Sequence, residues 1–460
     1  MYSPISPLPH NRRSAPTPPA VSRRVQRLSD TLANLVDSRT GIIRYVAEEP
    51  RRPEFPDVFQ YAAQTCETEA FLPHSAFGKT GGCAFSRPLA LAKAVGEAVE
   101  RYSAAIYDEN DMPLHPFASA PFAAVPPKSW ALNSAAQYTQ PDFEWEPFTD
   151  TTPVRWTPAQ NLVDASTIHV PAAMVYVPFY FYPASGEPTI CQPISTGLAC
   201  HCSTEEALIG GLCEVIERDS FMISWQARMG RKQIRRDTLS AQNIDLIQRL
   251  EATGVKITLF DLTMDNRVPA VMAVQTHDAH EMPAISLACS AALDAEEAVR
   301  KALEEITHTA RWMFYLKSRN PDFDPGPGYQ NVSGQEQHLI FWADHARRHL
   351  ADFIFDNTES ISFKEMESHG TGEPTQDLAV LVGLIKDTGH TPLAVDITPP
   401  DVAMTGLHVV RALIPGYHPL IMGYPIRALG GERLWSVPQA LGYRGIDCKS
   451  GDNPIPHPFP

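Results

Sequence analysis

Apolar residues recur along the chain with two different periods, which predict both helices and strands. An amphipathic stretch with leucines at helical spacing runs from Arg23 to Val36, and a turn at residues 37–41 separates it from a strand at residues 42–46. Longer helical patterns lie between the later apolar runs. The sequence therefore predicts an α+β fold with mixed sheets. Further strands are expected at residues 170–182, 256–262, 270–275 and 408–414.

The ends of the chain differ in composition from the rest. Residues 1–22 are rich in proline and serine and show no apolar period, which predicts a disordered leader. Residues 23–460 contain no clear linker and are interpreted as one catalytic domain. Residues 453–460 form a tail with proline at every second position, which favours an extended, polyproline-like conformation. A disordered surface tail is the alternative interpretation.

Three helical segments share one register. In each, an alanine stands seven residues before a glutamate, and a second polar residue follows that glutamate by three. Side chains three and four residues apart share one face of a helix. The other faces are apolar, so the carboxylates are expected to be buried. The segments are Ala90 to Glu97, Glu100 and Arg101; Ala207 to Glu214, Glu217 and Arg218; and Ala298 to Glu305 and His308.

Buried carboxylates require cations, because an isolated charge is costly to remove from water. Oxygen ligands from several helices, next to arginines, suit Mg²⁺ that bridges the phosphates of a nucleotide. The alternative is that each segment is an ordinary surface ion-pair motif, which is common and weak. Recurrence in one register, on unusually apolar helices, favours the metal and nucleotide interpretation.

Composition excludes several classes of partner. The net charge of −15 disfavours binding to nucleic acid or to an anionic membrane. The start of the chain has no signal core, and the longest apolar stretch is too short to span a bilayer, so a cytoplasmic protein is expected. The eight cysteines include no C-x-x-C pair, and the ligand spacing in Cys200-His201-Cys202 does not suit a zinc site.

These motifs together resemble the YcaO family, from about Leu32 to the end of the chain. The first helix resembles the motif S-x-x-x-E-x-x-E-R, and residues 195–219 resemble the second nucleotide-site motif. Residues 298–308 resemble A-x-x-R-A-x-x-E-x-x-Q, and residues 409–416 resemble a late strand of the family. The resemblance implies a nucleotide site formed by three carboxylate-bearing helices. It implies that Mg²⁺ is bound by Glu97, Glu100, Glu214, Glu217 and Glu305, and that ATP is contacted by Arg101, Glu206, Arg218, Lys301 and Arg411.

The sequence departs from the family motifs at four positions. Lys93 stands in place of the usual serine, Lys301 in place of arginine and His308 in place of glutamine, while Cys202 stands where asparagine is common. A lysine keeps the charge of an arginine but loses its bidentate fork. These changes suggest either an altered ATP geometry or a subunit that depends on a partner.

The resemblance implies an ATP-dependent enzyme that phosphorylates a backbone amide oxygen of a peptide. In azoline-forming members a Cys, Ser or Thr side chain then closes a ring, and a P-x-P-x-P tail reaches the active site. The tail residues expected to act in catalysis are Pro456, Pro458 and Pro460. Their terminal carboxylate is expected to serve as a positioned base.

The expected role is the discrete cyclodehydratase subunit of a thiazole/oxazole-modified, microcin-type peptide pathway that makes an antibiotic. Implied partners are the precursor peptide, a leader-binding protein similar to ubiquitin-activating enzymes, and a flavin-dependent azoline dehydrogenase. Two alternatives remain open, namely thioamide formation from sulfide and a YcaO scaffold that binds peptide without turnover.

Overall fold

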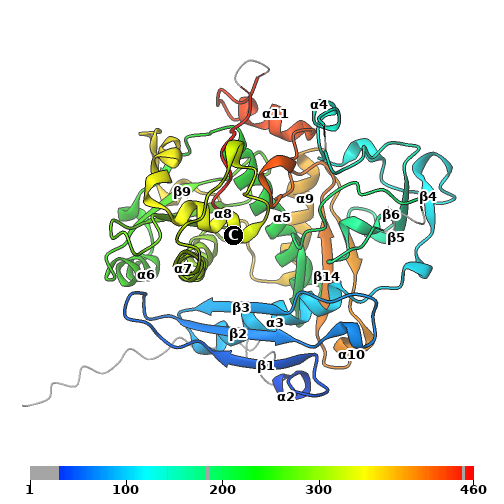
Figure 1. Ribbon diagram of the computed structural model, residues 1–460, viewed down its shortest axis with the longest axis horizontal. Helices are drawn as coiled ribbons and strands as arrows, with labels where there is room; N and C mark the ends of the chain where they lie inside the picture. The colour runs from blue at the N-terminus through cyan, green and yellow to red at the C-terminus, as the bar shows by residue number, and fades with distance from the viewer. Residues whose placement is uncertain (1–30, 142, 182–185, 448–450, 460) are drawn as a thin grey trace, which may run out of the picture.

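The computed structural model describes residues 31–141, 143–181, 186–447 and 451–459. The helices and strands form three sheets with helices between and around them (Figure 1). The predicted leader at residues 1–22 lies outside the described residues. No helix in the described part of the chain is long and apolar enough to cross a membrane.

The three sheets differ in size and strand order. The first is antiparallel, with the order β1-β2-β3; the second has the order β11-β10-β9-β8-β12; the third has the order β4-β5-β13-β14-β7, with β6 paired to β5. The strands are β1 (Ile43–Glu48), β2 (Phe59–Thr65), β3 (Lys79–Ala84), β4 (Leu114–Pro116), β5 (Pro153–Asn161), β6 (Thr167–Pro171), β7 (Leu198–His201), β8 (Gln233–Ile234), β9 (Lys256–Asp261), β10 (Ala270–Thr276), β11 (Ile285–Ala291), β12 (Ser360–Ile361), β13 (Leu393–Asp396) and β14 (His408–Leu413).

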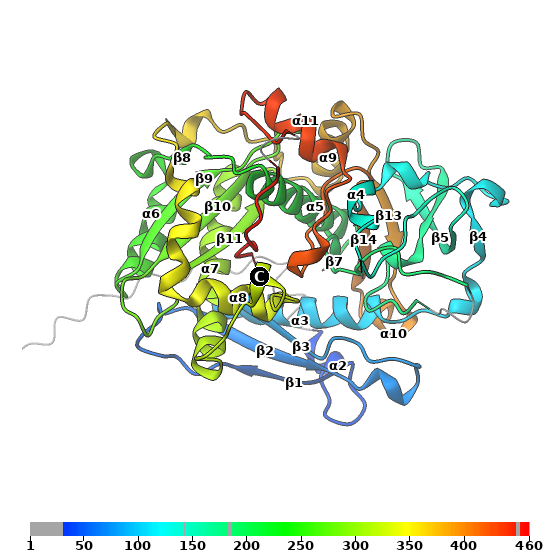
Figure 2. The same cartoon turned by 45° about the horizontal axis from the view of Figure 1, so that its top comes forward.

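Three long helices organise the molecule, one beside each sheet. They are α3 (Arg87–Ala104), α5 (Thr204–Gln226) and α7 (Ala295–Arg319). Helix α3 covers β2 and β3, α7 covers β10 and β11, and α5 lies between the two larger sheets against β14 and β11 (Figure 2). The other helices are α2 (Leu32–Leu35), α4 (Ala135–Tyr138), α6 (Ala241–Glu251), α8 (Gln335–Ala343), α9 (Pro374–Asp387), α10 (Pro400–Ala403) and α11 (Glu432–Ala440).

Most strands lie where the apolar pattern predicts them, but one expected strand is much shorter. Residues 42–46, 256–262, 270–275 and 408–414 correspond to β1, β9, β10 and β14. The strand expected at residues 170–182 ends at Pro171, and a 3-10 turn (Ala172–Met174) follows it. Proline cannot donate to a β-ladder, and this run contains both Pro171 and Pro178. Val175, Val177 and Phe179 are nevertheless buried, although they do not belong to a strand.

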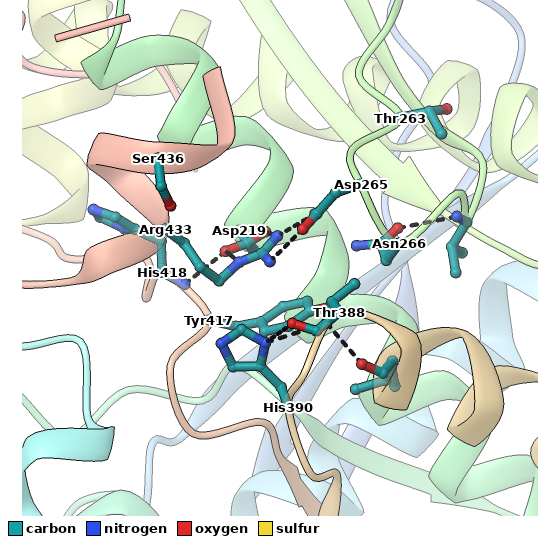
Figure 3. A network of polar contacts seen from close by, with 12 residues as sticks. Asp219, Thr263, Asp265, Asn266, Thr388, His390, Tyr417, His418, Arg433 and Ser436 are labelled. Atoms are coloured by element: carbon teal, nitrogen blue, oxygen red, sulfur yellow. Dashed lines mark hydrogen bonds and ion pairs between the residues drawn. The ribbon is translucent and has the colours of Figure 1, made fainter. Parts of the chain in front are cut away.

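A buried ion-pair network fixes the last helix to α5 (Figure 3). The Arg433 guanidinium of α11 donates to both carboxylate oxygens of Asp219, at 3.0 and 2.7 Å, and also to Asp265. Asp219 has no exposed surface and Arg433 is 3% exposed. The Tyr417 ring lies 4.1 Å from the guanidinium carbon. Because a buried charge is costly without its partner, this network anchors the segment from which the tail departs.

Candidate nucleotide and metal site

The three motif helices each follow a strand after a short loop, and the units contact one another in a closed ring. The units are β3–α3, β7–α5 and β11–α7, and α3 contacts β7, α5 contacts β11 and α7 contacts β3. Ser203 caps α5 by accepting a hydrogen bond from the Glu206 amide, and Asp294 caps α7 in the same way. The predicted carboxylate helices are therefore confirmed as helices, and their glutamates face a shared centre.

The first glutamates of the first two units are held in the same way. Glu97 accepts a hydrogen bond of 2.9 Å from the Gly81 amide, and its other oxygen lies 3.3 Å from Arg101. Glu214 accepts one of 3.0 Å from the Gly197 amide, and its other oxygen lies 3.0 Å from Arg218. Each glycine precedes its glutamate by 16 or 17 residues. The two motifs therefore share the same arrangement of hydrogen bonds as well as the same sequence pattern.

Gly197 needs the conformational freedom of glycine. Its φ is +91°, and a Cβ atom there would lie 2.2 Å from the carbonyl oxygen of Ala412 in β14. This close approach brings the Gly197 amide within reach of Glu214. At the equivalent position, a Cβ on Gly81 would lie 2.9 Å from the His308 ring. Sequence reasoning missed both amides as site elements, although the glycine run at residues 78–82 is a visible signal.

The second glutamates of the same motifs are more deeply buried and lack a full countercharge. Burial raises the pKa of Glu100 to about 8, against the lowering effect of Arg101, and the neighbouring Glu214 and Glu97 raise it further. Burial likewise raises the pKa of Glu217 to about 8. Glu100 also accepts a hydrogen bond of 2.8 Å from the Cys200 amide of β7. Both carboxyls would ionise readily only with a cation beside them.

The third unit behaves differently because it carries its own cation. Burial alone would raise the pKa of Glu305, but the adjacent His308 and the charges of Lys93 and Arg218 lower that pKa to about 2. The His308 and Glu305 side chains lie 3.7 Å apart. Glu305 is therefore an ionised carboxylate next to Glu217, and the histidine that replaces the motif glutamine partly neutralises it.

Arg411 of β14 is the clearest candidate for binding an anion. It is 4% exposed, and its Nε and Nη1 atoms have no hydrogen-bond partner among the described residues. Burial lowers the pKa of Arg411 to about 10, although the nearby Glu214 acts in the opposite direction. A buried guanidinium with free donors is suited to a phosphate group.

Two predicted ATP contacts, Glu206 and Lys301, already have ion-pair partners. Glu206 is in the first turn of α5, where its carboxylate lies 2.7 Å from His201 and 3.2 Å from the Ser203 hydroxyl. Lys301 is ion-paired with Glu297 at 3.1 Å.

Lys93, which replaces the motif serine, donates to Glu304 at 2.7 Å and to the Cys83 carbonyl, and so connects α3 to α7. The structure thus gives Lys93 a bridging contact that the sequence did not indicate.

The family model described as YcaO cyclodehydratase, ATP- and Mg²⁺-binding, matches residues 81–418, which is most of the chain. This chain belongs to the YcaO family. The α+β YcaO fold is therefore confirmed, and the description of the family agrees with the predicted cofactors, ATP and Mg²⁺.

Solved structures of YcaO proteins share this fold. A heterocyclase in complex with substrate and cofactor is 21% identical, with a TM-score of 0.77 over 95% of this chain, although this chain spans only 57% of that protein. A YcaO from Methanopyrus kandleri bound with AMPPCP and Mg²⁺ is 19% identical, with a TM-score of 0.60, covering 86% of this chain and 90% of that one. The Escherichia coli microcin synthetase McbBCD complex with pro-MccB17 bound gives 15% identity and a TM-score of 0.54, covering 89% and 96% of the two chains.

The residues around Glu100, Glu217 and Arg411 suit magnesium that is bound together with a nucleotide better than magnesium alone. Across the described ranges, no three acidic, histidine or cysteine side chains are already grouped as a metal site. Mg²⁺ usually takes one or two carboxylates and completes its shell with water and substrate phosphates. The buried carboxyls of Glu100 and Glu217 could supply the former, and Arg411 could bind the latter. These roles of Glu100, Glu217 and Arg411 remain predictions.

The proline-rich tail of this YcaO chain enters the interior, so the disordered-tail interpretation is wrong. Of the residues from Ile455 to Phe459, every one is buried. The Trp225 and Trp342 indoles donate to the Ile455 and Pro456 carbonyls at 2.9 and 2.8 Å. Pro456 and Pro458 thus lie inside the molecule, and Pro460 lies outside the described residues. Their predicted catalytic role is not tested by these contacts.

Magnesium binding should release protons from Glu100 and Glu217. With pKa values of about 8, both carboxyls are mostly protonated at neutral pH in the free protein, and a divalent cation must displace those protons. Affinity for Mg²⁺ with AMPPCP should therefore rise between roughly pH 6 and pH 8, as the two carboxyls lose their protons more readily. Calorimetry in buffers of different ionisation enthalpy should show proton release, and Glu100→Gln should release fewer protons than the native chain. Identical release by both proteins would contradict this assignment.

Proposed function

We propose that this chain is an ATP- and Mg²⁺-dependent cyclodehydratase subunit that forms azolines in a ribosomal precursor peptide. The observation that supports this most strongly is the buried tail, because residues 453–459 run along α5 from Trp225 to Arg218, next to the motif glutamates. A P-x-P-x-P tail that reaches the active site is the feature by which the chain resembles azoline-forming YcaO proteins. The backbone amides of Cys, Ser and Thr residues are the proposed targets.

In the proposed reaction the substrate supplies the nucleophile and ATP accepts the amide oxygen. A side-chain thiol or hydroxyl adds to the amide carbon, and the amide oxygen takes the γ-phosphoryl group from ATP, releasing ADP. Loss of phosphate then breaks the carbon–oxygen bond, and the nitrogen gives up its proton to form the carbon–nitrogen double bond of the ring. The proton of the thiol or hydroxyl leaves to a base when the ring closes. Bound magnesium would offset the charge that develops on the phosphates.

The residues of this chain would position the reactants and compensate charge. Arg411, Arg101 and Arg218 offer guanidinium groups to the phosphates, and Glu97 and Glu214 hold the latter two in place. Preorganised charge of this kind is usually the largest contribution to catalysis. The tail would place a base near the amide or its nucleophile, which is typically worth about a hundred- to ten-thousand-fold.

Mass spectrometry of the product separates the proposal from its two alternatives. Azoline formation removes one water molecule for each ring and needs no sulfur source. Thioamide formation exchanges oxygen for sulfur and stops when sulfide is withheld. A non-catalytic scaffold would leave the peptide unchanged and turn over no ATP.

The isolated chain should process precursor peptide slowly or not at all. We expect a leader-binding partner, similar to ubiquitin-activating enzymes, to raise turnover by orders of magnitude, because holding the substrate at the site replaces a bimolecular encounter. The measurement is the rate of ring formation with and without that partner, and the control is a peptide lacking its leader. Efficient processing of the full precursor by this chain alone would place the docking site within it. A flavin-dependent dehydrogenase that oxidises the azolines is proposed as a further partner.

A further inference from the structure

Phe459 in the tail covers one face of the Arg218 guanidinium. The guanidinium carbon lies 4.2 Å from the centroid of the ring. Phe459 is only 2% exposed, and its ring also packs against Phe221 of α5, with the centroids 4.8 Å apart. A cation held over an aromatic face in a site that excludes water is a favourable contact.

Two glutamates of the same helix lie along the edges of this guanidinium. Its Nη2 atom donates to Glu214 at 3.0 Å, and its Nε atom lies 3.4 Å from a Glu217 oxygen. The Nη1 atom is buried and has no hydrogen-bond partner among the described residues. The Phe459 ring and Glu214 thus hold the guanidinium from one face and one edge. Glu217 lies beside Nε without a hydrogen bond, and the Nη1 donors are left for an anion.

Several contacts hold the tail so that the Phe459 ring is itself fixed. The His338 ring nitrogen Nδ1 lies 2.7 Å from the His457 carbonyl oxygen, and the His457 ring bonds the Ile421 carbonyl at 2.9 Å. Two buried indoles, those of Trp225 and Trp342, bond the preceding carbonyls. Because these partners come from α5, α8 and the segment after β14, the position of the ring depends on the whole tail being docked.

We propose that Phe459 is a positioning residue that orients Arg218 toward a nucleotide phosphate and thereby couples tail docking to nucleotide affinity. The proposal rests on the proposed function in one respect, that Arg218 is a nucleotide ligand. The coupling is reciprocal: a docked tail strengthens nucleotide binding, and bound nucleotide stabilises the docked tail by the same factor.

The test is the affinity of the full chain for AMPPCP with Mg²⁺, measured by calorimetry without peptide. Phe459→Leu keeps an apolar side chain but removes the aromatic face, and it should weaken binding about three- to thirtyfold. Pentafluorophenylalanine at position 459 keeps the ring shape while reversing its charge distribution, and should weaken binding similarly. The matched control is Pro454→Ala, an exposed tail position, which should bind as the native chain does.

A second substitution separates orientation of Arg218 from general packing. Arg218→Lys removes the planar group that the ring covers, so Phe459→Leu should cause no further loss of affinity in that background. Fluorescence of Trp225 and Trp342 should show nucleotide-induced tightening of the tail in the native chain and a weaker response in Phe459→Leu.

The possible results distinguish the positioning role of Phe459 from the role of Arg218 as a nucleotide ligand. Native affinity in Phe459→Leu, or additive losses in the double variant, would overturn the positioning role while leaving Arg218 as a ligand. Native affinity in Arg218→Lys would overturn the nucleotide-site assignment of Arg218 and the positioning role with it. Because the assay contains no peptide, the outcome is independent of whether the product is an azoline.

Discussion

Glu217→Gln should reduce ATP turnover by at least about a hundredfold while the chain remains folded. Glu217 is a mostly buried carboxyl whose pKa burial raises to about 8, and it lies next to Glu214, Glu305 and Arg218. Glutamine has nearly the same shape but cannot supply the negative charge that a magnesium–nucleotide complex requires. The free protein loses no ionised group at neutral pH, so its melting temperature should stay within a few degrees of the native value.

Glu205→Gln is the matched control for this substitution. Glu205 belongs to the first turn of the same helix, α5, and has no predicted role in the site. The measurements are peptide-dependent ATP hydrolysis and thermal unfolding for both variants. Glu97→Gln and Glu214→Gln should behave as Glu217→Gln does. Native turnover in all three would identify these glutamates as structural ion-pair residues.

Removal of residues 456–460 should reduce ring formation about a hundred- to ten-thousand-fold at saturating nucleotide. The truncated chain should also be less stable, because Phe459 is almost fully buried and a side chain of this kind contributes about 1.5–3 kcal/mol. Nucleotide affinity should fall far less than the rate does, because Arg411 and Arg101 remain in place.

Pro454→Ala serves as the tail control, since Pro454 is exposed while its neighbours are buried. Rings formed per minute are to be compared with AMPPCP affinity and thermal unfolding for the native, truncated and control chains. Equal rates of ring formation in the native and truncated chains would remove the main support for azoline chemistry. Thioamide formation would then be an equal candidate.

The three carboxylate helices could be predicted because their signal is local. The spacing of alanine, glutamate and arginine on apolar helices is visible in one pass along the sequence, and it placed Glu97, Glu214 and Glu305 correctly on α3, α5 and α7. Strands such as β9 and β10 were equally visible. Apolar character alone misplaced residues 172–181, where prolines prevent a ladder.

The contacts that complete the site could not be predicted because they join distant segments. The Cys200 amide of β7 reaches Glu100 of α3 only once two strand–helix units pack together. The Gly81 and Gly197 amides reach the glutamates of their own units only once each strand packs on its helix. Lys93 reads as a departure from a motif, and its bond to Glu304 becomes visible only when α3 meets α7. Likewise, nothing in the tail sequence indicates that Phe459 contacts Arg218.

If ATP activates the peptide amide itself, the amide oxygen must leave on phosphate. A precursor peptide carrying oxygen-18 in the carbonyl before a cyclised residue is incubated with this chain, its leader-binding partner and Mg²⁺–ATP. The isotope in the released phosphate is then measured by phosphorus NMR. We predict that each ring formed transfers its labelled oxygen to phosphate. Recovery of the label in water, with unlabelled phosphate, would contradict the account.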